Sequence, residues 1–209
     1  MAARLLGLDD ILDLRAYERV RDDYRRRVIE LKRRRRVGLG PILTAVFESA
    51  DTVRFQVQEM ARAERIATDE GIAHELEVYN RLIPAEGELS ATLFVELTTE
   101  AELRHWLPRL VGIERALVFE LGTPVEFAVE SVPEASHAQA LTRETVTAAV
   151  HYVRFPFPPE AAERFADLDG PVALAVHHPQ YEARTELPPD VRAVLAADLA
   201  GRTELLPMG

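Results

Sequence analysis

The sequence has no cysteine, and Lys32 is its single lysine. Without cysteine the chain forms no disulfide, offers no thiolate nucleophile and cannot by itself hold an iron–sulfur cluster or a cysteine-bound zinc ion. With one lysine, a Walker-type phosphate loop and a Schiff-base lysine elsewhere in the chain are also excluded. Any metal ion would therefore have to be held by histidine and carboxylate side chains.

Long apolar runs are also missing. The sequence contains no run of about 18 apolar residues, the length that a membrane-spanning helix needs, and acidic residues interrupt its N-terminal stretch where a signal peptide would be apolar. The composition, 47% hydrophobic and 29% charged over 209 residues, is typical of a globular protein with a core of its own. We therefore expect a cytoplasmic protein.

The charge is unevenly distributed along the chain. Residues 1–40 carry 12 of the 25 lysines and arginines against 7 acidic residues, a balance of +5, and the remaining residues carry 13 against 28, a balance of −15, which together make the net charge of −10. A basic arm on an acidic body favours an anionic partner or self-association as a homodimer over a DNA-binding domain.

The first part of the chain has helical periodicity. A long helix is predicted from Arg15 to Arg36, with one apolar stripe made of Tyr17, Val20, Tyr24, Val28 and Leu31. A turn at the glycines and proline of 38–41 follows. After it we predict a short helical segment through Phe47, a helix at 51–68 and a helix at 71–82.

Basic residues cover much of these predicted helices. Arg33–Arg36 end the first one, and Arg54, Arg62 and Arg65 give a later one a mixed face. Three interpretations stay open for the arginine run: a solvated face, a contact with a protein or acidic surface, and a nucleic-acid site. Because no aromatic residues that could stack on bases are interleaved with it, we consider nucleic acid the weakest of the three.

The second part of the chain alternates between strands and helices. Strands are predicted at 89–98, 114–121, 125–131, 146–155 and 171–177, helices at 99–108, 158–168 and 188–199, and a fraying tail after them. This order predicts an α+β fold in which an N-terminal helical layer packs on a mostly antiparallel, ferredoxin-like (βαβ-type) sheet. We place the helical region at 1–86 and the sheet region at 87–209, in one cooperative domain.

A metal site would need His and carboxylate ligands from both parts. Glu64 shares a helix face with Val53 and Val57, so we expect it to be buried and to need an arginine, a metal ion or a proton as partner. His151 lies on the covered face of its strand, and His178 ends the last strand. The sharpest metal hypothesis joins Glu64, His151 and His178 around Fe, Mn or Zn. Wider ligand candidates are Glu59, His74, Glu75 and His177.

Each of these residues also has a simpler interpretation. A buried histidine bonded to its neighbours explains His151, and an Arg–Glu pair explains Glu64. No nucleophile elbow and no HExxH motif is present, so whether the protein is an enzyme stays open.

Several stretches carry a family resemblance. They are Arg33–Pro41, Asp51–Met60, Glu64–Ile66, Glu75–Leu76, Tyr79–Asn80, Gly87–Leu93 and the His178-Pro-x-Tyr181 motif. Together they resemble an uncharacterised bacterial family, a domain of unknown function, over nearly the whole chain. The resemblance implies a gene neighbourhood with a rubrerythrin-type protein and an iron–sulfur oxidoreductase, and hence an accessory part in redox or peroxide defence. It supplies no catalytic residues.

Two hypotheses result. The first is a binding protein without a cofactor of its own, which holds a protein partner of rubrerythrin or iron–sulfur type through a basic surface. That surface would consist of Arg33, Arg34, Arg35, Arg36, Arg54, Arg62 and Arg65. The second is a metal-binding protein or metalloenzyme with the ligands named above.

Overall fold

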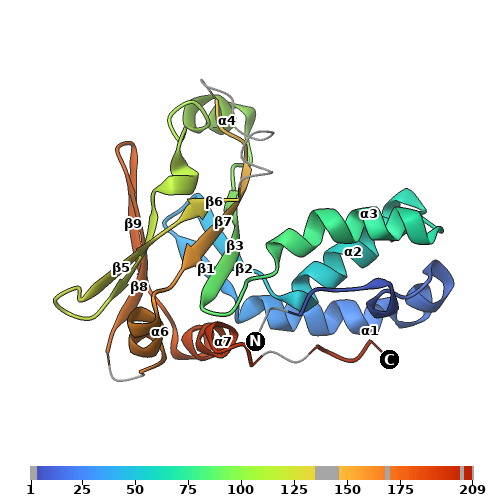
Figure 1. Ribbon diagram of the computed structural model, residues 1–209. Coiled ribbons are helices and arrows are strands. Elements are labelled where there is room, and N and C mark those ends of the chain that lie inside the picture. The colour runs from blue at the N-terminus through green and yellow to red at the C-terminus, as the bar shows by residue number, and fades with distance from the viewer. Residues whose placement is uncertain (1–3, 135–145, 168–169, 203–204, 209) are drawn as a thin grey trace.

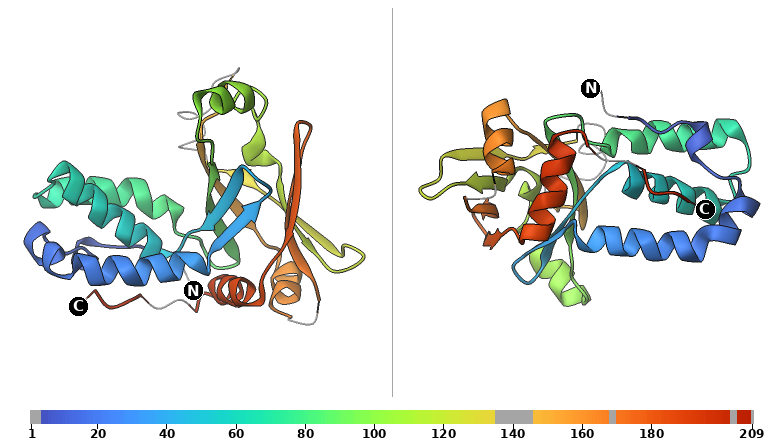
Figure 2. Two further views of the ribbon diagram at one scale, coloured as in Figure 1. Left: turned by 180° about the vertical axis from the view of Figure 1, so that it is seen from behind. Right: turned by 90° about the horizontal axis from the view of Figure 1, so that it is seen from below.

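The computed structural model describes residues 4–134, 146–167, 170–202 and 205–208. A layer of three helices projects from a body made of two β-sheets (Figure 1). The views in Figure 2 show the same layer extending to one side of the sheets, with two further helices beneath them. The predicted α+β class is confirmed.

The helices are α1 (Leu14–Arg33), α2 (Ala50–Glu64), α3 (Asp69–Tyr79), α4 (Glu100–Trp106), α6 (Pro159–Ala166) and α7 (Pro189–Leu199), with short 3-10 turns at Leu8–Asp10, Asn80–Leu82 and Ile113–Arg115. The strands are β1 (Arg36–Leu39), β2 (Leu43–Phe47), β3 (Glu88–Val95), β4 (Leu117–Leu121), β5 (Phe127–Glu130), β6 (Val132–Pro133), β7 (Val150–Pro156), β8 (Val172–His178) and β9 (Tyr181–Glu186).

The strands divide between two sheets. One has the order β1-β2-β3-β7-β6 and the other β5-β4-β8-β9, and every pair is antiparallel. The chain passes from β5 to β6 with one residue between them, and so crosses from one sheet to the other. The ferredoxin-like order predicted from the sequence is therefore not confirmed.

The first hairpin is a correction to the sequence prediction. The segment ending at Phe47 is strand β2 and not a helix, and β1 begins at Arg36, inside the predicted helical region. In β1 the exposed Arg36 and Gly38 alternate with the buried Val37 and Leu39, which is the period of a strand. Gly40 turns the hairpin with φ +69°, where a Cβ atom would also lie 2.4 Å from the Tyr181 hydroxyl oxygen.

Where β1 of one sheet lies beside β9 of the other, side-chain hydrogen bonds connect the two sheets. Tyr181 Oη donates a hydrogen bond to the Leu39 carbonyl, and Thr185 Oγ1 donates one to the Gly38 carbonyl. These two side-chain bonds satisfy carbonyl groups of the edge strand β1, although β1 and β9 form no backbone pairing in the described sheets. The two sheets therefore enclose a single core.

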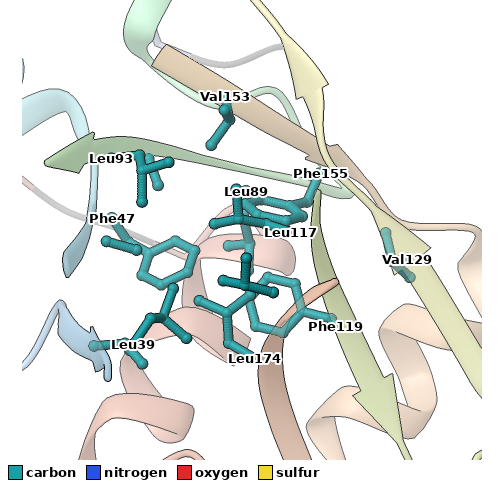
Figure 3. Close-up of a cluster of buried hydrophobic side chains, with 14 of the residues drawn as sticks. Leu39, Phe47, Leu89, Leu93, Leu117, Phe119, Val129, Val153, Phe155 and Leu174 are labelled. Carbon is teal, nitrogen blue, oxygen red and sulfur yellow. The ribbon is translucent and has the colours of Figure 1, made fainter. Parts of the chain in front are cut away.

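Aromatic rings fill this core (Figure 3). Phe119 of β4 lies at its centre, with its ring centroid 4.8 Å from that of Phe155 and 5.7 Å from that of Phe47. The Phe119–Phe155 pair packs edge to face, with 71° between the ring planes, an arrangement that stabilises aromatic pairs beyond the burial of their area. Phe165 of α6 and Leu195 of α7 belong to the same cluster, so these helices cover one end of the core.

The helical layer packs as the stripe on α1 predicts. Tyr17, Tyr24 and Val28 are buried against α2, and α2 packs in turn on α3. The predicted fraying of the tail is wrong for residues 205–208. Leu205, Leu206 and Met208 instead pack on the apolar clusters of the helical layer.

A buried ion pair joins the layer to the body. Arg35, predicted to lie on the basic surface, is 2% exposed, and its Nη1 lies 2.6 Å from Asp198 Oδ2 on α7. Its Nη2 lies 3.0 Å from Asp198 Oδ1, which makes the contact bidentate. The alternation of β1 explains the correction, because Arg35 points inward where Arg36 points outward.

This pair generates a stability prediction. Arg35→Ala is expected to lower the free energy of unfolding by about 3–5 kcal/mol, because Asp198 loses its buried guanidinium partner. Urea unfolding followed by circular dichroism measures the loss. The double variant R35M/D198L should lose much less, since it leaves no charge in the interior. A double variant as unstable as R35A would contradict this account.

Candidate functional site

A pocket of about 310 Å³ lies where α1 meets the outer face of the first sheet. Its lining combines apolar and basic side chains: Ile29, Lys32, Arg33, Arg36, Val46, Glu48 and Phe94. We call this set the basic groove. It contains two of the seven arginines that the sequence proposed for partner binding.

The local structure explains why these side chains meet. Lys32 and Arg33 belong to the last turn of α1, and Arg36 opens β1 three residues after that helix ends. Phe94 of β3 points away from the core because its neighbours Leu93 and Val95 point into it. Ile29, one turn before Arg33, is 47% exposed. The groove thus has an apolar floor beneath a basic rim.

The cations of the rim have weak partners. Arg33 pairs with Glu30 and Arg36 with Glu96, and all four side chains are about half exposed or more, where such pairs contribute little. A hydrogen bond from Thr44 and the Arg36 guanidinium both lower the pKa of Glu96. The rim arginines therefore remain available to an external anion.

Lys32 and Glu48 complete the electrostatics of the groove. Within the described residues Lys32 has no carboxylate partner, and its Nζ lies 5.6 Å from the centroid of the Phe55 ring. The Glu48 carboxylate accepts hydrogen bonds from the hydroxyl groups of Thr52 and Thr92. These hydroxyl groups are neutral, so Glu48 offsets part of the positive charge of the rim, but among the described residues no rim cation forms an ion pair with it.

The other predicted arginines have different positions. Arg35 is buried against Asp198, and Arg54 is 5% exposed inside the helical layer, so neither belongs to the exposed basic surface that the sequence predicted. Arg34, Arg62 and Arg65 remain at the surface, where Arg62 pairs with Glu18. Arg54 was predicted to lie on the surface because helical periodicity alone does not show that this side of α2 packs against α1.

The predicted metal ligands do not come together. Glu64 is exposed at the last position of α2, beyond the packed part of the helix, so its predicted burial is wrong. His178 donates from Nε2 to the Val111 carbonyl and accepts at Nδ1 from the Gln180 N–H. Across the described part of the chain, no three His, Asp or Glu side chains cluster closely enough to hold a metal ion.

His151 is buried as predicted, and its carboxylate neighbour is Glu114. The ring is 3% exposed, and its Nε2 lies 2.9 Å from both the Ala148 carbonyl oxygen and Thr147 Oγ1. Since a carbonyl only accepts, Nε2 carries a proton and Nδ1 of the neutral ring is bare. Nδ1 lies 3.8 Å from Glu114 Oε2, a buried oxygen with no hydrogen-bond partner among the described residues. A proton or a cation between these two acceptors would satisfy both.

Sequence reasoning missed Glu114 because it assigned this residue to a strand. It lies in the 3-10 turn Ile113–Arg115, which follows Gly112 at φ +92°. In the sequence, Gly112 indicates a turn before the apolar run that forms β4. The direction in which the Glu114 carboxylate points depends on tertiary packing, so the sequence could not predict it.

The fold and these sites define an α+β protein with a basic, apolar-floored groove and a buried histidine–carboxylate pair. The chain belongs to the family described as "Protein of unknown function (DUF3501)", whose model matches residues 6–199. The resemblance to an uncharacterised family is thus confirmed. The gene neighbourhood stays a prediction.

A solved structure resembles the chain over nearly its whole length. The chain is similar to a crystal structure of a novel protein of unknown function from Burkholderia pseudomallei, with 35% sequence identity and a TM-score of 0.84. The match covers 94% of this chain and 100% of that chain. The comparison with curated proteins found no match.

The buried histidine generates a pH prediction. Burial holds the pKa of His151 below its ordinary value, although the Glu114 carboxylate and the Ala148 carbonyl raise it in part. The folded state therefore resists protonation, and below about pH 6.5 the unfolded state takes up a proton that the folded state does not. Stability should fall with decreasing pH by up to about 1.4 kcal/mol per unit from this group.

Unfolding measured between pH 7 and pH 5 tests this prediction. His151→Gln should remove that part of the slope whatever it does to the stability at pH 7. His74→Gln, at an exposed position of α3, is the control and should keep the full slope. Equal slopes for the His151 variant and the wild type would contradict the assignment.

Proposed function

We propose that the protein is a cytoplasmic binding protein that holds an acidic partner protein in the basic groove. The observation that carries this proposal is the convergence of Lys32, Arg33 and Arg36 around an apolar floor on a chain whose net charge is −10. Against an acidic body, one basic site selects both the partner and its orientation through electrostatic complementarity.

The groove fits a particular kind of partner surface. The floor of Phe94, Val46 and Ile29 accepts an apolar side chain, and the rim accepts carboxylates on either side of it. An aromatic or aliphatic anchor with charged surroundings is the usual composition of a strong protein contact. The partner should therefore present an apolar residue flanked by aspartate or glutamate.

The identity of the partner is the further part of the proposal. The family resemblance supports a rubrerythrin-type or iron–sulfur protein of a redox or peroxide-defence module. Such a protein would bring its own iron, consistent with a chain that has no cysteine.

Charge reversal in the groove tests the proposal. A native lysate is passed over the wild-type chain at low salt, the recovered acidic protein is purified, and its Kd is measured at several salt concentrations. R33E/R36E should weaken binding about tenfold or more, because two attractive contacts become repulsive. The expected partner contains iron, which elemental analysis shows.

Arg15→Glu/Arg19→Glu reverses the same number of charges and is the matched control. Both arginines are exposed on the same helix, 14 or more positions before Arg33 and so about 21 Å or more away. Their reversal should change Kd less than twofold. An equal loss for both variants would mean that overall charge and not the groove drives binding, and recovery of nothing at any salt concentration would refute the proposal.

A metal-binding protein or metalloenzyme is the second candidate, favoured by Glu114 Oε2, which lacks a hydrogen-bond partner in the described part of the chain and lies opposite His151 Nδ1. Elemental analysis of protein purified without chelator separates the two candidates. Stoichiometric Fe, Mn or Zn that is lost in His151→Ala and in Glu114→Gln, but kept in Glu64→Gln, would support this second function. Metal-free protein, or metal that all three variants keep, would count against it.

A further inference from the structure

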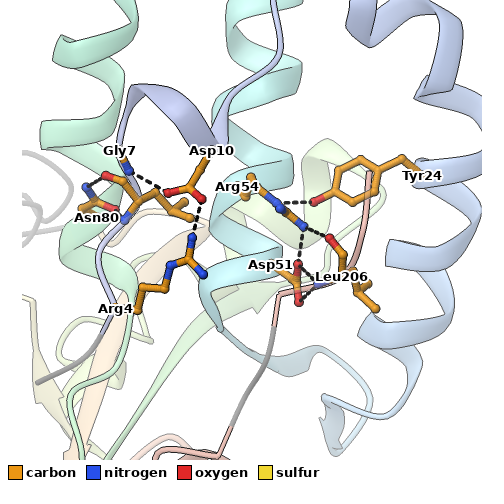
Figure 4. A network of polar contacts seen from close by, with 9 residues as sticks. Arg4, Gly7, Asp10, Tyr24, Asp51, Arg54, Asn80 and Leu206 are labelled. Carbon is orange, nitrogen blue, oxygen red and sulfur yellow. Dashed lines mark hydrogen bonds and ion pairs between the residues drawn. The ribbon is translucent and has the colours of Figure 1, made fainter. Parts of the chain in front are cut away.

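The C-terminal tail lies on the helical layer and is held there by its backbone (Figure 4). The Leu206 N–H donates to both carboxylate oxygens of Asp51, at 3.0 Å and 3.2 Å. The Leu206 carbonyl accepts a hydrogen bond from Arg54 Nη2. Two charged side chains thus bind the amide and the carbonyl of one residue.

These two side chains are deeply buried. Asp51 is 1% exposed and Arg54 is 5% exposed. Arg54 Nη2 also lies 2.7 Å from Asp51 Oδ1, and its Nε donates to Tyr24 Oη at 3.0 Å. Burial raises the pKa of Asp51, so the charged carboxylate needs the donors around it. Replacing a buried pair of this kind by apolar residues of the same size is often neutral or stabilising, so the pair is weak evidence of a role in stability.

The apolar contacts of the tail alternate in direction. Leu205 packs on the cluster of Val53, Val57 and Leu76, whereas the next residue, Leu206, packs on the cluster of Tyr17, Tyr24 and Val28. Adjacent side chains of an extended segment point to opposite sides. The two clusters therefore contact the tail in the way that a peptide-binding groove contacts an extended ligand.

We infer that the Asp51–Arg54 pair and the two flanking clusters form a peptide-binding site, and that the chain's own tail is its resident occupant. The external ligand is an extended segment of a partner protein with two adjacent large apolar residues, the second of which has a free N–H. The tail itself is the template for this chemistry. The site shares no residue with the basic groove and goes beyond the function proposed above.

The covalent attachment of the tail sets the strength of the competition. A short tether gives the tail an effective concentration on the order of millimolar at its own site. A partner segment must exceed that competition, so the wild-type chain should bind a free tail peptide weakly. Weakening the tail in the intact chain should make the same peptide bind more tightly.

Leu206→Pro in the full-length chain makes this change. Proline has no N–H, so the bond to Asp51 is lost while the rest of the tail remains. A fluorescent peptide with the sequence of residues 203–209 is titrated into both chains and followed by anisotropy. The variant should bind it about tenfold more tightly than the wild type, because a hydrogen bond to a charged group no longer holds the competing tail.

Two controls identify the contact. Asp51→Asn combined with Leu206→Pro should bind at least tenfold more weakly than Leu206→Pro alone, and a peptide N-methylated at its second leucine should bind neither chain. Circular dichroism checks that each variant is folded. Equal peptide affinity of wild type and Leu206→Pro, absence of binding to folded Leu206→Pro, or undiminished binding of the N-methylated peptide would each overturn the inference.

Discussion

The buried contact between Arg35 and Asp198 is the constraint on which the arrangement of the molecule depends. The backbone of Arg35 serves two elements, since its N–H donates to the Lys32 carbonyl at the end of α1 and its carbonyl accepts from Phe47 N–H of β2. Its side chain reaches α7, 163 positions away in sequence. One residue therefore ends the first helix, starts the first hairpin and ties both to the last helix.

The basic groove is a consequence of this constraint. With Arg35 drawn inward, Arg33 on the last turn of α1 and Arg36 on β1 both face solvent and line one pocket with Lys32. Of the four consecutive arginines, one is thus buried in an ion pair and the others remain at the surface, because the chain changes from helix to strand within the run. A straight helix through Arg36 would have spread the same charges around its circumference.

The sequence predicted some parts of the fold well. The stripe on α1, the helix predicted at 99–108 and the burial of His151 follow from local spacing and appear in the structure. The hairpin at 36–47 was missed because its first strand has only four residues and begins inside an arginine run that also suits a helix. The division into two sheets was missed because the pairing of distant strands has no local signal.

The same reasoning separates the surface residues from the buried ones. Arg35 and Arg54 resemble Arg33 and Arg36 in sequence, and their contacts with Asp198, Asp51 and the tail distinguish them. Glu114 became a candidate through its distance to His151, which no spacing encodes.

The most direct test of the central claim, that the basic groove holds the partner, uses Lys32. It is the single side-chain amine of the protein, so an amine-reactive reagent reports on the groove, with the α-amino group as an internal reference. The rate of labelling at Lys32 is measured by mass spectrometry with and without saturating partner. The account predicts that the partner slows Lys32 labelling about tenfold or more relative to the α-amino group, and an unchanged ratio of the two rates at saturation would contradict it.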